Sequence, residues 1–234
     1  MKMIIDKFLH DQQVGSRSEI HDLIKQRRIQ MDGQKVKSFK LSVNPQVNHV
    51  TVDGQLISGQ QDYYYVLNKP AGVITATKDT HNKTVMDLIN EPDRRDDLFP
   101  VGRLDKDTTG VLLIMNDGKL SHQLVSPKQH AEKIYHAELT ANLSEDDLRQ
   151  LIDGVTLKDG TFVQADGADM ISSQPPVVEL AIHEGKYHQI KRMIGYLGQK
   201  VVRLNRVSFA GINVSGLNPG EYRELTEQEL SSIK

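Results

Sequence analysis

The order of strand-like and helix-like segments is the feature that most constrains the fold of this chain. Residues 63–67 and 111–115 have the continuous apolar character of buried strands. Helical patterns at 84–90, 144–152 and after residue 188 are interspersed with them, without a regular strand–helix–strand alternation. A doubly wound parallel sheet needs that alternation. We therefore predict an α+β fold with a mixed, mainly antiparallel sheet flanked by helices.

The N-terminal quarter of the chain has a pattern of its own, in which a capped helix precedes short strands. Ser16 and Glu19 have the spacing of a capping box, and an apolar face at i, i+3 and i+4 follows them. The Asp-Gly pairs at 32–33 and 53–54 are typical of tight hairpin turns. This pattern predicts a small α/β unit.

A short polar stretch separates this unit from the rest of the chain. Residues 58–62 read SGQQD, and such small polar side chains are typical of linkers. A length of 234 residues is compatible with one or two domains. We therefore predict a first domain at 1–57, a linker at 58–62 and a second domain at 63–234.

Composition excludes several classes of protein. The chain has no cysteine, so it forms no disulfide and has no cysteine metal site. No stretch approaches the roughly 20 apolar residues that cross a bilayer. Asp6 and Lys7 interrupt the N-terminal apolar run, which therefore does not resemble a signal peptide. We expect a cytoplasmic protein without a membrane partner, and a monomer, because no apolar face is left over.

The distribution of charge is uneven along the chain. The net charge is −2, but residues 1–59 contain nine Lys and Arg against six Asp and Glu. Residues 185–206 contain six basic residues and no acidic one. Such patches can bind phosphates on an otherwise neutral protein. On charge alone, solvated surfaces explain them better than a nucleic-acid partner does.

Common cofactor and metal motifs are absent from the sequence. It contains no Walker loop and no GxGxxG, HExxH or GxSxG motif. His183 and His188 are five residues apart, a spacing that does not place two ligands on one helix face. We expect no cofactor and no metal, and a structural or surface role for the histidines.

The stretch VGRLDKDTTGVLLIMNDG at 101–118 places a cluster of charges directly before a buried strand. In an extended backbone, Arg103 and Asp105 point to the same side. The arginine would favour the ionised form of the carboxylate, which could then act as a nucleophile or a base. A polar turn before a strand is the simpler interpretation of these local features. Asp107 lies two residues further along, so in an extended backbone it points to the same side as Asp105. We expect it to resemble a site residue by position only, without a role in the site.

Two further segments contain candidate site residues. In KIYHAEL, strand alternation puts Tyr135 on a buried face, where its ring is either core or a stacking surface for a base. On the helix predicted further along, the apolar stripe is centred near Ile190. Lys191 flanks this stripe and can reach a buried site, whereas Arg192 points toward solvent or a phosphate. A lysine that merely extends along an apolar surface fits the same pattern.

These segments together resemble the RsuA-type pseudouridine synthases, the RsuA/RluB/RluE/RluF family. GRLDKDTTG is similar to the motif with the catalytic aspartate, YYVLNKPAGVITAT to the block before it, and EKIYHAEL to the block with the active-site tyrosine. EGKYHQIKRMIGYLG resembles the block with the active-site basic residue, and NPGEYRELTEQEL the C-terminal end. The first 57 residues resemble the small RNA-binding domain first seen in ribosomal protein S4. The blocks span nearly the whole chain in the family's order.

The resemblance implies an enzyme that isomerises uridine to pseudouridine in ribosomal RNA without a cofactor. It implies that Asp105 is the nucleophile, that Tyr135 stacks on the flipped base, and that Lys191 pairs with Asp105. It also implies RNA contacts for basic residues of both domains, namely Arg103, Arg192, Arg17, Lys25, Arg27 and Arg28.

The resemblance also suggests a target. The run YHQIKRM at 187–193 is similar to the enzymes of the small ribosomal subunit, which implies uridine 516 of 16S rRNA in an assembling particle. A uridine of 23S rRNA is an alternative within this class. A non-catalytic RNA-binding assembly factor is another alternative. A nucleoside or glycoside hydrolase is a third, and it would need Asp107 as a second carboxylate.

Overall fold

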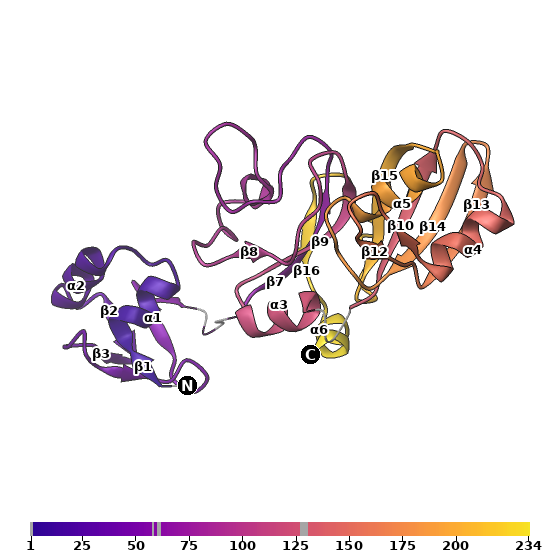
Figure 1. Cartoon of the computed structure of the whole chain (residues 1–234). Helices are drawn as coiled ribbons and strands as arrows, with labels where there is room; N and C mark the ends of the chain where they lie inside the picture. Colours follow the sequence, from indigo (N-terminus) through magenta and orange to yellow (C-terminus); the bar gives the residue numbers. More distant parts are fainter. Residues whose placement is uncertain (1, 58, 60–61, 127–130) are drawn as a thin grey trace. The chain divides into compact units, whose positions relative to one another are not determined.

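The structure is a computed structural model of the chain (Figure 1), and the residues that it describes are 2–57, 59, 62–126 and 131–234. The chain divides into two compact units, residues 1–62 and 63–234. Each unit encloses an apolar core of its own. Residues 58, 60 and 61 of the predicted linker lie outside the described residues.

The first unit combines two helices with short strands. Strands β3, β2, β5 and β6 form an antiparallel sheet in that order, and β1 pairs with β4. Apolar side chains from both helices, including Phe8 and Ile20, pack with Ile29 of the sheet in one buried cluster. The bounds are β1 Met3–Ile4, α1 Ile5–Asp11, α2 Arg17–Lys25, β2 Ile29–Met31, β3 Gln34–Lys35, β4 Ser42–Val43, β5 Val50–Val52 and β6 Gln55–Leu56.

The predicted cap and turns of this unit are confirmed. The Ser16 side chain accepts a hydrogen bond from the Glu19 backbone, and the Glu19 carboxylate accepts one from the Ser16 backbone. Asp32 and Asp53 both adopt φ of 50°, and the glycine after each is also left-handed. These are the backbone conformations that a two-residue hairpin turn requires. Helix α1 was not predicted, because its seven residues are too few for a clear periodic pattern.

The second unit is built on a mixed sheet, as predicted. The strand order is β13-β14-β10-β15-β9-β7-β16, with β8 added beside β9. Among the described residues, β15 and β9 run parallel, and the other neighbouring strands of this sheet are antiparallel. Its strands are β7 Tyr64–Lys69, β8 Phe99–Pro100, β9 Thr109–Met115, β10 Lys133–Leu139, β13 Gly167–Ser173, β14 Pro176–Ile182, β15 Val201–Phe209 and β16 Tyr222–Glu224.

Strands β7 and β9 are buried on both faces, which explains their continuous apolar sequences. Tyr65 and Leu67 belong to one apolar cluster, whereas Tyr64 and Val66 belong to a second cluster on the opposite face. The second cluster includes Leu120 of α3, and residues of α6 pack against it. The first includes residues of α4 and α5. The helices therefore flank the sheet on both sides.

The helices of this unit agree only partly with the predicted ones. The pattern at 84–90 forms only a short 3-10 helix. It ends after one turn, at Ile89, whose backbone is extended. The pattern at 144–152 forms α4, which Ser144 caps. Helix α3 was not predicted; Asp117 caps it by accepting from two backbone amides. The bounds are η1 Val85–Leu88, α3 Gly118–Val125, α4 Glu145–Asp153, α5 Gln189–Tyr196 and α6 Glu227–Ile233; a two-stranded sheet pairs β11 Val155–Thr156 with β12 Phe162–Val163.

The parallel pairing of β9 with β15 brings the turn that precedes β9 toward helix α5, which precedes β15. In its register Gly110 lies opposite Arg206. A Cβ on Gly110 would lie 2.1 Å from the Arg206 carbonyl oxygen, and the residue has a positive φ of 98°. Only glycine therefore allows β9 to begin at this point.

In the part of the chain that is described, no helix has the length and apolar character needed to cross a membrane.

Candidate active site

The turn that contains Asp105 is held by a buried lysine at the end of β7. The Lys69 side chain is fully buried, and Nζ donates to the backbone carbonyls of Asp105 at 3.0 Å and Thr108 at 2.8 Å. Burial lowers the pKa of Lys69 to about 8, although Asp107 and Asp105 lie nearby. Thr75 Oγ1 secures the preceding residue by donating to the Leu104 carbonyl at 2.8 Å. The backbone of the turn is therefore held rigidly from the protein interior.

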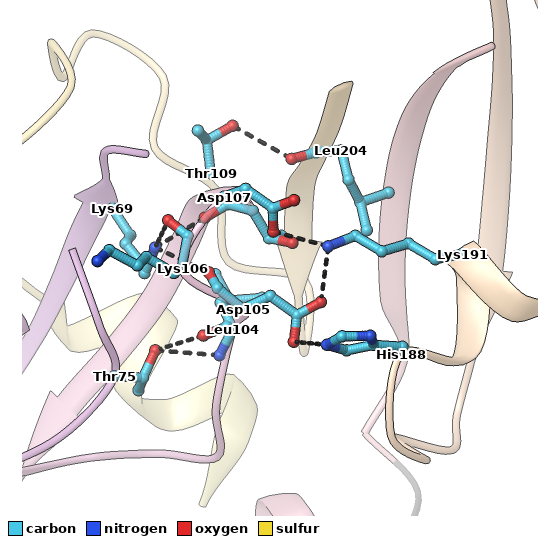
Figure 2. A network of polar contacts seen from close by, with 11 residues as sticks. Lys69, Thr75, Leu104, Asp105, Lys106, Asp107, Thr109, His188, Lys191 and Leu204 are labelled. Carbon is cyan, nitrogen blue, oxygen red and sulfur yellow. Dashed lines mark hydrogen bonds and ion pairs between the residues drawn. The ribbon is translucent and has the colours of Figure 1, made fainter. Parts of the chain in front are cut away.

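Figure 2 shows the Asp105 carboxylate between two basic side chains of the α5 region. Lys191 Nζ lies 3.0 Å from Oδ2, and His188 Nε2 lies 3.3 Å from Oδ1. The local sequence pattern predicts Arg103 as the cationic neighbour of this carboxylate. Among the described residues Arg103 makes no ion pair with Asp105, so that part of the local argument is wrong. The charge of the carboxylate is instead compensated from a helix far along the chain.

His188 is a site residue that sequence reasoning missed. It precedes α5 with φ of 48°, a left-handed conformation that non-glycine residues seldom adopt. Its ring stacks on that of Tyr187, with the centroids 3.9 Å apart. The spacing to His183 argues only against a metal pair, and the sole sequence signal is the position of His188 next to the basic helix. Its contact with Asp105 places it at the candidate site, where a histidine was not expected from the sequence.

Lys191 is shared between two carboxylates. Its Nζ donates to Asp107 Oδ1 at 2.6 Å as well as to Asp105. Burial disfavours the ammonium, but the hydrogen bonds to Asp107 and Asp105 outweigh that effect and raise the pKa of Lys191. The hydrogen bond from Lys191 likewise lowers the pKa of Asp107. Asp107 therefore belongs to the charge network around Asp105, which was not expected from the sequence. Its side chain is 73% exposed, compared with 30% for Asp105.

The two adjacent basic residues of α5 have different partners. Lys191 reaches Asp105, whereas Arg192 Nη2 lies 2.5 Å from Asp159 Oδ2. Arg192 Nη1 also donates to the Tyr187 carbonyl. This difference follows from the turn of about 100° per residue on a helix. Of the two, Lys191 is the residue that the fold brings to the candidate site.

Tyr135 lies beside Asp105 in a cleft of about 440 Å³, which we call the Asp105 cleft. The Tyr135 side chain is buried on the same face of β10 as Ala137 and Leu139, as strand alternation predicts. Arg103, which is exposed, lines the same cleft. The described residues bring no three His, Asp or Glu side chains together as metal ligands. The cleft thus combines a held carboxylate with an aromatic wall.

The basic residues singled out in the first unit are exposed or engaged locally. Arg17 is exposed at the start of α2, and Lys25 Nζ lies 3.0 Å from Asp22. Arg27 has a left-handed backbone and donates to the Val36 carbonyl. Arg28 Nε donates to Asp53 at 2.7 Å and so links the end of α2 to the β5–β6 hairpin. All four side chains are exposed, and local contacts engage Lys25, Arg27 and Arg28.

Comparison with known proteins gives a consistent result. Residues 63–195 match the family model described as RNA pseudouridylate synthase. An uncharacterised RNA pseudouridine synthase of Bacillus subtilis is 41% identical, covering 97% of each chain. Ribosomal small subunit pseudouridine synthase A of Escherichia coli is 36% identical, covering 99% of this chain and all of that protein. A crystal structure of a pseudouridylate synthase superimposes with a TM-score of 0.68 at 31% identity, covering 99% of this chain and 100% of the other.

The match includes the turn with Asp105, the strand with Tyr135 and the helix with Lys191, since all three lie within residues 63–195. The relatives extend the similarity to both units of the chain. The chain therefore belongs to the RNA pseudouridylate synthase family.

Proposed function

We propose that this chain converts a specific uridine of ribosomal RNA to pseudouridine, with Asp105 as the nucleophile. The observation that carries this proposal is the placement of the Asp105 carboxylate. It is held between Lys191 and His188, on a turn that the buried Lys69 secures, and it opens into a cleft walled by Tyr135. Relatives named for the small ribosomal subunit support ribosomal RNA as the substrate.

The target that we propose is uridine 516 of 16S rRNA. The run at 187–193 and the names of several relatives point to the small subunit. The overall charge of the chain is slightly negative, which is unfavourable for tight binding to free RNA. We therefore propose an assembling small subunit as the physiological substrate. A uridine of 23S rRNA is the alternative.

The reaction is an isomerisation without net oxidation or reduction. The N1–C1′ bond of uridine breaks, the base turns, and a C5–C1′ bond forms, while C5 loses a proton and N1 gains one. Asp105 attacks either the sugar C1′ or base C6, and its bond to the substrate breaks again before release. The carboxylate is 30% exposed, so a flipped nucleotide can reach it.

The other residues around Asp105 would have distinct roles. Lys191 compensates the charge of the carboxylate before attack and loses that partner when the covalent bond forms. The Tyr135 ring stacks on the flipped uracil and holds it near Asp105. Arg103 lies exposed at the rim of the cleft, where it can occupy the gap left by the flipped nucleotide or meet its phosphate.

We also propose that residues 1–57 form an S4-like domain that docks on structured RNA and that the chain acts as a monomer. The exposed cations of this domain, Arg17, Lys25, Arg27 and Arg28, would contact phosphates. Residues 63–234 have their own core, so a truncated protein can be tested. Removal of residues 1–57 should weaken RNA binding more than it slows a single turnover. Equal activity of the truncated protein on assembling particles would contradict this.

The first experiment maps pseudouridine directly. Carbodiimide-adduct primer extension across 16S rRNA would compare the wild-type strain with one that carries Asp105→Asn. We expect a stop at position 516 that disappears in the variant. A stop in 23S rRNA that depends on Asp105 would move the target and keep the enzyme assignment. If neither RNA changes while Asp105→Asn fully complements a deletion, the chain is an assembly factor without catalytic function.

A further inference from the structure

A second cleft lies beside the Asp105 cleft and contains basic groups that the proposed mechanism does not use. We call it the Arg206 cleft; its volume is about 890 Å³. It shares four lining residues with the Asp105 cleft, so the two clefts adjoin; the shared residues are Arg103, Tyr135, Gly185 and Lys186. Three further residues form its apolar wall, namely Val101, Val125 and Phe209.

Arg206 lies in this cleft with its hydrogen-bonding capacity only partly used. The residue is 2% exposed, and its Nε donates to the Val111 carbonyl at 2.7 Å. Its Nη2 is buried and has no hydrogen-bond partner among the described residues. The guanidinium packs over the Phe209 ring at 4.7 Å. A guanidinium stays charged, so leaving its buried Nη2 without an acceptor is costly unless a ligand supplies one.

Lys133 adds a second buried cation. Its Nζ donates to the carbonyls of Ala131 at 2.7 Å and His183 at 2.6 Å, both of which are neutral. Burial, together with the charge of Arg206 close by, lowers the pKa of Lys133 to about 8. Lys133 is therefore still largely charged at neutral pH, so two like charges share the floor of the cleft.

The acidic groups nearby are already paired with other residues. Glu184 lines the cleft, but its carboxylate lies 2.9 Å from Lys186 Nζ. Asp166 lies 2.7 Å from His183 Nδ1. In the described part of the chain, Arg103, Lys133 and Arg206 form no ion pair with any carboxylate. Asp166 offsets the charge of Lys133 only in part and without an ion pair, so the cleft keeps a positive charge that an anion would neutralise.

We propose that the Arg206 cleft binds a phosphodiester group of the RNA next to the reacting uridine, with Arg206 and Lys133 as its floor and Arg103 at its rim. The apolar wall would contact the sugar or base of the same nucleotide. This inference rests on the proposed function in one respect, because it places the reacting uridine in the Asp105 cleft. The second contact would fix the register of the strand, so that one uridine reaches Asp105.

The test measures RNA affinity against salt concentration, because each phosphate contact contributes about one unit to the slope of log affinity against log salt. Binding of a 16S rRNA transcript would be measured for wild type, Arg206→Gln, Arg206→Lys and Lys133→Gln over a series of KCl concentrations. The matched control is Arg149→Gln, since Arg149 is an exposed arginine on α4 that lines neither cleft.

We expect Arg206→Gln and Lys133→Gln each to reduce the slope by about one unit and to weaken binding by roughly tenfold. Arg206→Lys should retain the wild-type slope, and the control should change neither quantity. An unchanged slope in folded Arg206→Gln would overturn the proposal. Weaker binding at an unchanged slope would also overturn it, in favour of a neutral acceptor such as a base edge. If Arg206→Gln does not fold, Lys133→Gln decides by the same criteria.

A substrate modification tests the same contact from the RNA side. Single methylphosphonate linkages, which lack the phosphate charge, would be placed in turn at the linkages flanking the target uridine. At one of them wild type should lose about tenfold in affinity, whereas Arg206→Gln should lose nothing further. Equal losses for both proteins at every linkage would overturn the proposal. Because these measurements need no turnover, they can be interpreted even if Asp105 proves not to be the nucleophile.

Discussion

Lys69 Nζ donates to the backbone carbonyl of Asp105 at 3.0 Å from a fully buried position at the end of β7. The same ammonium reaches the carbonyls of Pro70, Lys106 and Thr108. A single charge therefore organises the whole turn that presents the candidate nucleophile, without touching the carboxylate itself. Because the contacts are made to main-chain atoms, they fix the backbone and leave the Asp105 side chain available for chemistry.

We predict that Lys69→Met destabilises the fold and slows the reaction. Methionine fills the same space but leaves several buried carbonyls without a donor, which should cost about 2 kcal/mol of unfolding free energy at neutral pH. Misplacement of Asp105 should lower kcat by roughly tenfold or more. Urea denaturation and single-turnover assays would measure both effects. Lys78→Met, at an exposed position, is the control and should change neither.

The pH dependence of stability should reveal the buried lysine. Burial lowers the pKa of Lys69 to about 8, from 10.5 in the unfolded chain. Between these values the unfolded chain binds a proton that the folded chain has lost, so the free energy of unfolding rises with pH, by up to about 3 kcal/mol. The free energy of unfolding of wild type should therefore increase relative to that of Lys69→Met as pH rises through this window. Lys133 titrates in both proteins and cancels; a constant difference would contradict the prediction.

Lys191 and Arg192 should behave differently when each is replaced. Lys191→Met removes the ammonium 3.0 Å from Asp105 and should lower kcat by roughly a hundredfold. Arg192 pairs with Asp159, so Arg192→Gln should leave kcat at saturating RNA close to wild type and affect only RNA affinity. Single-turnover rates and binding constants would separate the two effects. A larger loss of kcat in Arg192→Gln would refute the assignment of Lys191.

Gly110→Ala should be strongly destabilising. The new methyl group would lie 2.1 Å from the Arg206 carbonyl oxygen at a φ of 98°, where β9 and β15 run parallel. We expect a loss of about 3 kcal/mol in unfolding free energy. Gly118→Ala is the matched control, because a Cβ on this first residue of α3 would have nothing within 4 Å. Thermal denaturation of both variants would check this; similar melting temperatures would contradict it.

The sequence by itself determined the class of fold and many of the local elements, although helices α1 and α3 were not predicted. The capping box at Ser16, the two Asp-Gly turns and the apolar runs of β7 and β9 were readable because each depends on residues only a few positions apart. The side of the helix on which Lys191 lies could be predicted from the sequence for the same reason. Resemblance to a known family then singled out Asp105 among several polar residues of one turn, which the local pattern alone had not done.

Only the tertiary structure explains why particular residues meet, and local sequence patterns predicted none of these contacts; the pairing of Lys191 with Asp105 was expected from the family resemblance alone. Lys191 and Asp105 are 86 residues apart, and their contact depends on β9 pairing in parallel with β15. The contact of His188 with Asp105, the sharing of Lys191 with Asp107 and the buried position of Lys69 follow from that same arrangement. So does the Arg206 cleft. Local periodicity says which face a side chain occupies, but the order of strands in the sheet decides what lies opposite that face.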